Sequence, residues 1–172
     1  MRSFSYNQLP VRVVFGLGAL DDLLREIELL GAKRALVLST AGHKTQAEEV
    51  VDRLGDRCVG IFAGAVMHVP IEMAREARAE AKRLSADCLL AIGGGSTTGL
   101  AKAIALESAL PILAIPTTYA GSEMTPVYGL TEAGMRALFP RTQLVTIKGA
   151  GHWVHSEQPQ AFLATMRRFL GL

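Results

Sequence analysis

The sequence predicts an α/β protein with a three-layer, mostly parallel, Rossmann-like sheet and helices on both faces. Short apolar runs alternate with helix-length stretches along most of the chain. These runs are continuously apolar, which is typical of strands buried on both faces of a parallel sheet. One run, at the start of residues 89–107 (LLAIGGGSTTGLAKAIALE), leads through three glycines into an Ala-rich helical stretch. That layout indicates a strand, a phosphate-sized loop and a helix start.

The first predicted strand covers residues 11–15. A Gly-Leu-Gly turn then leads into a helix whose apolar residues recur on one face, with Gly31 at the position that follows a helix end. The second strand covers residues 34–38, and after a polar loop a helix is expected over residues 46–54, ending at Gly55.

The third predicted strand covers residues 58–62. Pro70 starts the next helix, which carries small and apolar side chains along one side and Glu and Arg along the other. The fourth strand, residues 88–92, enters the glycine loop.

A fifth apolar run, residues 111–115, is followed by a hydroxyl-rich loop at residues 116–123. Residues 124–130 are a further strand candidate, which Pro126 confines to an edge of the sheet. In open parallel sheets, ligands bind outside the carboxyl ends of the strands. We therefore expect the glycine loop and the hydroxyl-rich loop to lie at the same functional edge.

Composition narrows the function classes. The 172 residues are 49% hydrophobic and 20% charged, which is enough for one packed core. A net charge of +2, without any block of five like charges, argues against a nucleic-acid partner. No uninterrupted apolar stretch reaches the roughly 18 residues of a membrane span, and the N-terminus is not of signal-peptide type. Cys58 and Cys88 lie in apolar, strand-like runs, where a cysteine is typically a buried, reduced thiol. Reduced thiols are typical of the cytoplasm, so we expect a cytoplasmic protein.

The glycine loop has the chemistry of an anion site. Gly93, Gly94 and Gly95 lack a Cβ, so a pyrophosphate could approach their N–H groups at the positive end of a helix. The hydroxyls of Ser96 and the two following threonines add donors and a candidate helix cap. The alternative is a tight strand-to-helix turn without any ligand, and the loop is not the G-x-G-x-x-G fingerprint.

Three motifs carry a family resemblance. The segments FGLGAL from Phe15, GGGST from Gly93 and PTTYAGSEMTP from Pro116 resemble the amino-terminal domain of the iron-containing alcohol dehydrogenase superfamily, most closely its maleylacetate reductase branch. The resemblance covers residues 4–134. It implies a dinucleotide-binding domain, with a nicotinamide dinucleotide as partner.

The resemblance also implies which residues of these motifs contact the cofactor, and it bears on which form of the cofactor is bound. Relatives that prefer NAD often carry an Asp after the second strand, where this chain has Ser39 and Thr40, so NAD and NADP both stay open. The family's second, all-helical domain, which holds the metal and closes the cleft, is not found in the sequence, so we expect weak or absent activity. The implied cofactor-binding residues are Gly93, Gly94, Gly95 and Ser96 for the pyrophosphate, Thr117, Thr118 and Ser122 for the adenine and ribose side, and Thr40 after the second strand.

A metal site is not predicted. The four histidines are His43, His68, His152 and His155. His152 and His155 are three residues apart, but one loop pair is too few ligands for a catalytic cation. Loop histidines with solvent or backbone partners are expected.

From Met135 onward the sequence resembles the carboxyl terminus of an α/β-hydrolase. It predicts a last strand at residues 143–147, a GAGHW loop and a closing helix. We therefore expect a chimera with domains 1–134 and 135–172, the tail adding its strand and helix at an edge of the same globule. The apolar stripe of the closing helix comprises Phe162, Leu163, Met166, Phe169 and Leu170.

The tail resemblance implies a hydrolase-like general base at His152. No G-x-S-x-G elbow accompanies it, so Ser96 and Ser122 are the candidate nucleophiles. Three hypotheses follow: a nicotinamide cofactor-binding protein with weak or absent reductase activity, a small esterase or lactonase using His152 with a Ser, and a fold without a catalytic role. Apolar surface left by the missing helical domain predicts a homo-oligomer.

Overall fold

The computed structural model describes residues 11–67, 69–118, 121–125 and 158–170. The chain divides into two units, Met1–Gly134 and Met135–Leu172, and each is described by itself. Within the described ranges, no helix is long and apolar enough to cross a membrane.

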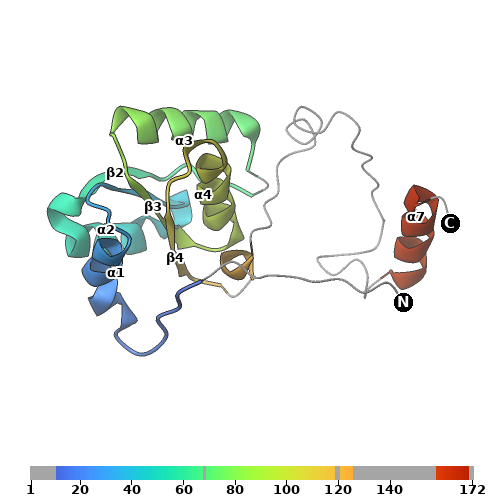
Figure 1. Ribbon diagram of the computed structural model, residues 1–172, viewed down its shortest axis with the longest axis horizontal. Helices are drawn as coiled ribbons and strands as arrows, with labels where there is room; N and C mark the ends of the chain where they lie inside the picture. Colours follow the sequence, from blue (N-terminus) through green and yellow to red (C-terminus); the bar gives the residue numbers. More distant parts are fainter. Residues whose placement is uncertain (1–10, 68, 119–120, 126–157, 171–172) are drawn as a thin grey trace. The chain divides into compact units, whose positions relative to one another are not determined.

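The first unit is built on a parallel four-stranded sheet of order β2-β1-β3-β4 (Figure 1). Every residue of β1 and β3, the two central strands, is buried, as their continuous apolar runs predict. The predicted α/β fold class is confirmed, and four of the predicted strands agree with the structure to within one residue at each end. The strands are β1 (Ala35–Leu38), β2 (Cys58–Phe62), β3 (Cys88–Gly93) and β4 (Ile112–Pro116).

Helices cover both faces of this sheet, so the unit has three layers (Figure 1). On one face Ile27 of α1 and Val50 of α2 pack with the β-strand residues Val37 and Leu90. The helices are α1 (Leu23–Leu29), α2 (Lys44–Leu54), α3 (Ile71–Arg83) and α4 (Gly95–Ser108), with the 3₁₀ turns η1 (Ala19–Asp22), η2 (Ala41–His43), η3 (Gly55–Arg57) and η4 (Ser122–Met124).

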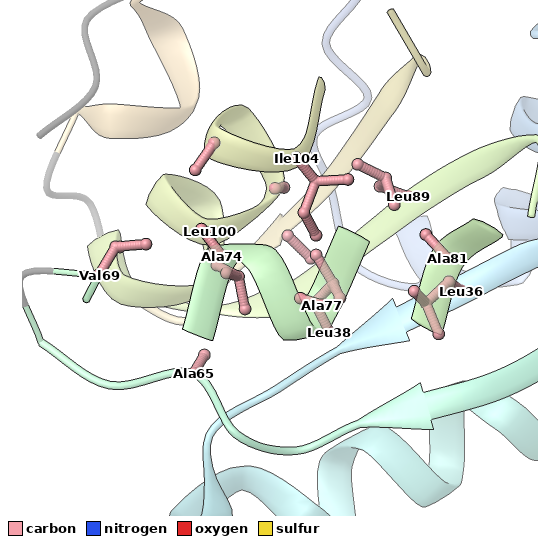
Figure 2. Packing of buried hydrophobic residues seen from close by; sticks show 13 residues of the cluster. Leu36, Leu38, Ala65, Val69, Ala74, Ala77, Ala81, Leu89, Leu100 and Ile104 are labelled. Carbon is pink, nitrogen blue, oxygen red and sulfur yellow. The ribbon is translucent and has the colours of Figure 1, made fainter. Parts of the chain in front are cut away.

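The opposite face is covered by α3 and α4, whose small residues let them approach the sheet closely (Figure 2). Ala77 of α3 and Ile104 of α4 are fully buried against Leu36 and Leu89. The central strands β1 and β3 therefore send alternate side chains into two separate cores, which fixes their register in the sheet.

Two strand predictions differ from the structure. Residues 11–15 form no strand and are exposed, with Phe15 at 85%. Strand conformation needs a neighbouring strand to pair its backbone groups, and none of the described strands pairs with this segment. Met124 lies in η4 rather than in a strand, while residues 126–130 lie outside the described part.

Helix ends follow the sequence signals. Gly31 has a left-handed φ of 71°, and its N–H donates to the Glu28 carbonyl at 2.9 Å, as expected after a helix end. In the second unit the closing helix is confirmed as α7 (Pro159–Leu170). The predicted strand at residues 143–147 lies outside the described residues.

Candidate functional site

The structure brings three polar segments to one edge of the sheet. They lie at the carboxyl ends of β1, β3 and β4, and comprise residues 39–43, 93–98, 117–118 and 121–124. The chain leaves β1 toward the outer strand β2 and leaves β3 toward β4, so the order reverses between β1 and β3. A crevice at such a switch point is where open α/β sheets bind ligands.

The three glycines occupy different positions at this edge. Gly93 ends β3 with φ 140°, and a Cβ there would lie 2.8 Å from Thr97 Oγ1. A Cβ on Gly94 would lie 2.8 Å from Thr118 Oγ1. A Cβ on Gly95 would meet nothing within 4 Å, so space is open beside the first residue of α4.

The start of α4 differs from the sequence prediction. Gly94 is the N-cap and makes no side-chain capping bond, so the predicted cap by a Ser or Thr hydroxyl is wrong. The hydroxyls of Thr97 and Thr98 donate instead to the Gly94 carbonyl, at 2.9 and 3.3 Å. The first N–H groups of a helix have no intrahelical partner, and here no side chain in the described part of the chain caps them. They can therefore bind an anion at the positive end of α4.

The hydroxyl-rich loop after β4 lies against the glycine loop. The Thr117 N–H donates to the Gly93 carbonyl at 3.0 Å, which continues the β3–β4 pairing by one residue. Lys102 of α4 donates to the backbone carbonyl of Ser122 and, at 3.3 Å, to its hydroxyl. Burial lowers the pKa of Lys102, and the charge of Glu123 opposes this shift. Thr117 and Thr118 thus lie beside Gly93 and Gly94, and Ser122 contacts α4 through Lys102, so the two loops share one edge, as predicted.

The segment after β1 completes the edge. Ser39 is buried, and its hydroxyl makes no hydrogen bond to any residue that the structure describes. Thr40 Oγ1 is hydrogen-bonded to His43 Nδ1 at 2.8 Å. The other ring nitrogen, His43 Nε2, lies 3.5 Å from Thr117 Oγ1.

Sequence reasoning missed two of these side chains. His43 has side-chain partners, not the solvent or backbone partners expected of a loop histidine. Its position five residues after a predicted strand end was a usable signal, because that end lies at the ligand edge. Lys102 gave no such signal, since its contact with Ser122 joins residues that are 20 positions apart.

The hydrolase-like prediction has a separate outcome. Ser96 is the second residue of α4, Ser122 begins η4, and His152 lies outside the described residues. Pairing of His152 with either serine therefore stays a prediction, and no observation on the two serines favours it.

The described residues were also expected to lack a metal centre. In the described ranges, no group of three or more His, Cys, Asp or Glu side chains could hold a metal ion. These residues therefore do not fit a resident iron, and no chemical step is derived through one.

The parallel sheet with helices on both faces defines a Rossmann-like α/β protein. At its switch point, the start of α4 has no side-chain cap among the described residues. Residues 10–145 match the iron-containing alcohol dehydrogenase family, and the chain belongs to that family. The matched segment runs past residue 134, so it overlaps the start of the predicted hydrolase-like tail.

Individual relatives agree with this assignment. A maleylacetate reductase from Burkholderia cepacia is 64% identical over 136 residues, covering 79% of this chain and 39% of that protein. The crystal structure of maleylacetate reductase from Agrobacterium tumefaciens has a TM-score of 0.72 at 48% identity, covering 76% of this chain and 37% of that one. This chain thus spans well under half of each of these two relatives.

A more distant structure shares the fold. Sulfoacetaldehyde reductase from Bifidobacterium kashiwanohense, solved in complex with NAD+, has a TM-score of 0.69 at 22% identity. It covers 78% of this chain and 41% of that one. At this identity the likeness concerns the fold alone.

Proposed function

We propose that the chain binds a nicotinamide dinucleotide, NAD or NADP, at the carboxyl edge of β3 and β4. The observation that carries this proposal is the uncapped start of α4 with open space beside Gly95. The pyrophosphate accepts hydrogen bonds from the backbone N–H groups of Gly94, Gly95 and Ser96.

The surrounding residues fit such a group. A Cβ on Gly94 would collide with Thr118, so the backbone there is as close to the neighbouring loop as a glycine allows. Across the switch point, the buried Ser39 hydroxyl has no hydrogen-bond partner among the described residues. The first turn of α2, which follows Thr40 and η2, contains no acidic residue. Thr117, Thr118 and Ser122 supply the adenine and ribose side.

The reaction class follows from the relatives. Several are named maleylacetate reductases, and we propose that a protein containing this domain reduces maleylacetate or a similar keto acid. The bound cofactor would supply a hydride. The residues of this chain bind and orient it, but binding alone does not stabilise a transition state. For the 172-residue chain by itself we therefore propose cofactor binding with weak or absent reduction.

Two further properties belong to the proposal. Free Cys58 and Cys88 suit a reducing compartment, so we propose a cytoplasmic location. The exposed apolar side chains of Phe15 and Leu17 support the proposed homo-oligomer.

The test is a titration of the chain with NADH and NADPH, followed by cofactor fluorescence. In Gly95→Val the new side chain enters open space in the free protein but blocks the pyrophosphate, so we expect an unchanged melting temperature. Affinity should fall about tenfold or more, the effect of losing one hydrogen bond to a charged group. The matched control is Ala79→Val on the exposed face of α3, which should bind normally.

Two results would contradict the proposal. One is the absence of a saturable signal with both cofactors at millimolar concentration. The other is wild-type affinity in Gly95→Val.

A further inference from the structure

The His43 side chain joins two loops that come from strands on either side of β3. One ring nitrogen is hydrogen-bonded to Thr40, two residues beyond the end of β1, and the other contacts Thr117, directly beyond the end of β4. Because the sheet order is β2-β1-β3-β4, β3 lies between these two attachment points. The contacts of His43 with Thr40 and Thr117 therefore connect the two loops that flank the carboxyl end of β3.

This position places the ring at the glycine loop. Thr117, the second partner of His43, also donates its backbone N–H to the Gly93 carbonyl at 3.0 Å. Parallel strands lie about 4.8 Å apart, so β1 and β4, which flank β3, lie about two such spacings apart. The side chains of Thr40, His43 and Thr117 together bridge this distance. A pyrophosphate at the start of α4 would lie next to this ring.

The two bonds of the ring differ in strength. The Thr40 contact of 2.8 Å is partly buried and has ordinary hydrogen-bond length. The Thr117 contact of 3.5 Å is exposed and lies at the outer limit for a hydrogen bond. In a neutral imidazole one nitrogen accepts and the other donates. With Nδ1 accepting from the Thr40 hydroxyl, Nε2 carries the proton and is only weakly held.

We propose, resting on the cofactor binding proposed above, that His43 is a dinucleotide-contacting residue. Its Nε2–H leaves the Thr117 hydroxyl and donates to a pyrophosphate oxygen of NAD or NADP. Thr40 anchors the ring at Nδ1 throughout, so the exchange needs only a small rotation of the imidazole. The dinucleotide thus gains a side-chain donor from the β1 side of the switch point, opposite the backbone donors of α4.

Three substitutions at one position test this contact. In His43→Gln an amide nitrogen can reach the place of Nε2, in His43→Asn it reaches only the place of Nδ1, and His43→Leu has no donor. We expect the dissociation constant for NADH or NADPH to rise about tenfold in His43→Leu and His43→Asn, the effect of one hydrogen bond to a charged group. His43→Gln should stay within about threefold of wild type.

A spectroscopic measurement separates contact from a purely structural bridge. In the full chain labelled with ¹⁵N-histidine, the His43 Nε2 resonance, assigned by its loss in whichever His43 variants fold, should shift on saturation with cofactor. If any variant fails to fold, this measurement on the wild-type chain still decides. Wild-type affinity in His43→Leu and His43→Asn, or an unmoved Nε2 resonance at saturation, overturns the inference alone. A wild-type chain that binds neither cofactor overturns the proposed function and this inference with it.

Discussion

At the scale of single residues, Gly94 is the position of the glycine loop where a side chain would collide with the loop after β4. Glycine lets the two loops approach closely here, because a Cβ at Gly94 would lie only 2.8 Å from the Thr118 hydroxyl oxygen. Its backbone angles, φ −93° and ψ −152°, are open to any residue, so the constraint is the neighbour and not the conformation.

This contact leads to a coupling prediction. Gly94→Ala should lower the free energy of unfolding by about 1 kcal/mol, because the Thr118 side chain must move aside. Thr118→Ala removes the obstructing hydroxyl, so the double variant should recover most of that loss. Urea denaturation of all four proteins gives the coupling energy. Additive losses in the double variant would show that the two loops do not meet here.

How well a site residue can be predicted from the sequence depends on how far apart in the chain its contact partners lie. The shared edge of the glycine loop and the hydroxyl-rich loop could be predicted from local patterns, because a strand, a turn and a helix start are neighbours in sequence. The bridge from His43 to Thr117 joins residues 74 positions apart, and it exists only once the strand order is known. The capping prediction at α4 was wrong because the Thr97 hydroxyl donates to a carbonyl instead of accepting from an N–H.

At the scale of elements, α3 and α4 are joined by one arginine. The guanidinium of Arg78 donates twice to the Ala103 carbonyl, at 3.1 and 2.7 Å, and contacts Glu107 at 2.6 Å. These bonds tie the helix that follows β2 to the helix that carries the candidate site.

We expect Arg78→Met to lower the free energy of unfolding by about 1–3 kcal/mol, because the hydrogen bonds from a charged donor to Ala103 are lost. The matched control is Arg75→Met on the same helix, where the arginine is exposed and the change should stay within about 0.5 kcal/mol. Chemical denaturation monitored by circular dichroism measures both. Equal stability of the two variants would mean that the Arg78 bonds contribute nothing.

Helices and strands were easier to predict where the segment itself has a clear hydrophobic pattern. The four parallel strands and α1 to α4 follow from continuous apolar runs, helical periodicity and glycine stops. Residues 11–15 have the same apolar character but form no strand, because strand formation also needs a pairing partner, which a local pattern does not reveal.

At the scale of the whole molecule, exposed apolar residues in the first unit predict self-association. Phe15 is 85% exposed and Leu17 108%, and both lie in the segment that precedes α1. Exposed apolar surface of this kind favours contact with another molecule. We expect the chain to sediment as a homo-oligomer at micromolar concentration.

The double variant Phe15→Ser, Leu17→Ser should shift sedimentation toward the monomer while the circular dichroism spectrum stays the same. The matched control is Leu29→Ser, an exposed leucine on α1 outside that segment. A wild-type chain that sediments as a monomer would refute the expectation.

The central claim is that the carboxyl edge of β3 and β4 holds a nicotinamide dinucleotide. The most direct test is a titration of the ¹⁵N-labelled chain with NADH and NADPH, followed by backbone amide chemical shifts. We predict that the largest changes fall on Gly94, Gly95, Ser96 and Thr117. The amides of Arg34 and Asp87, at the amino ends of the strands, should stay unchanged. Saturable changes centred on Arg34 and Asp87, or no changes at millimolar cofactor, would contradict the account.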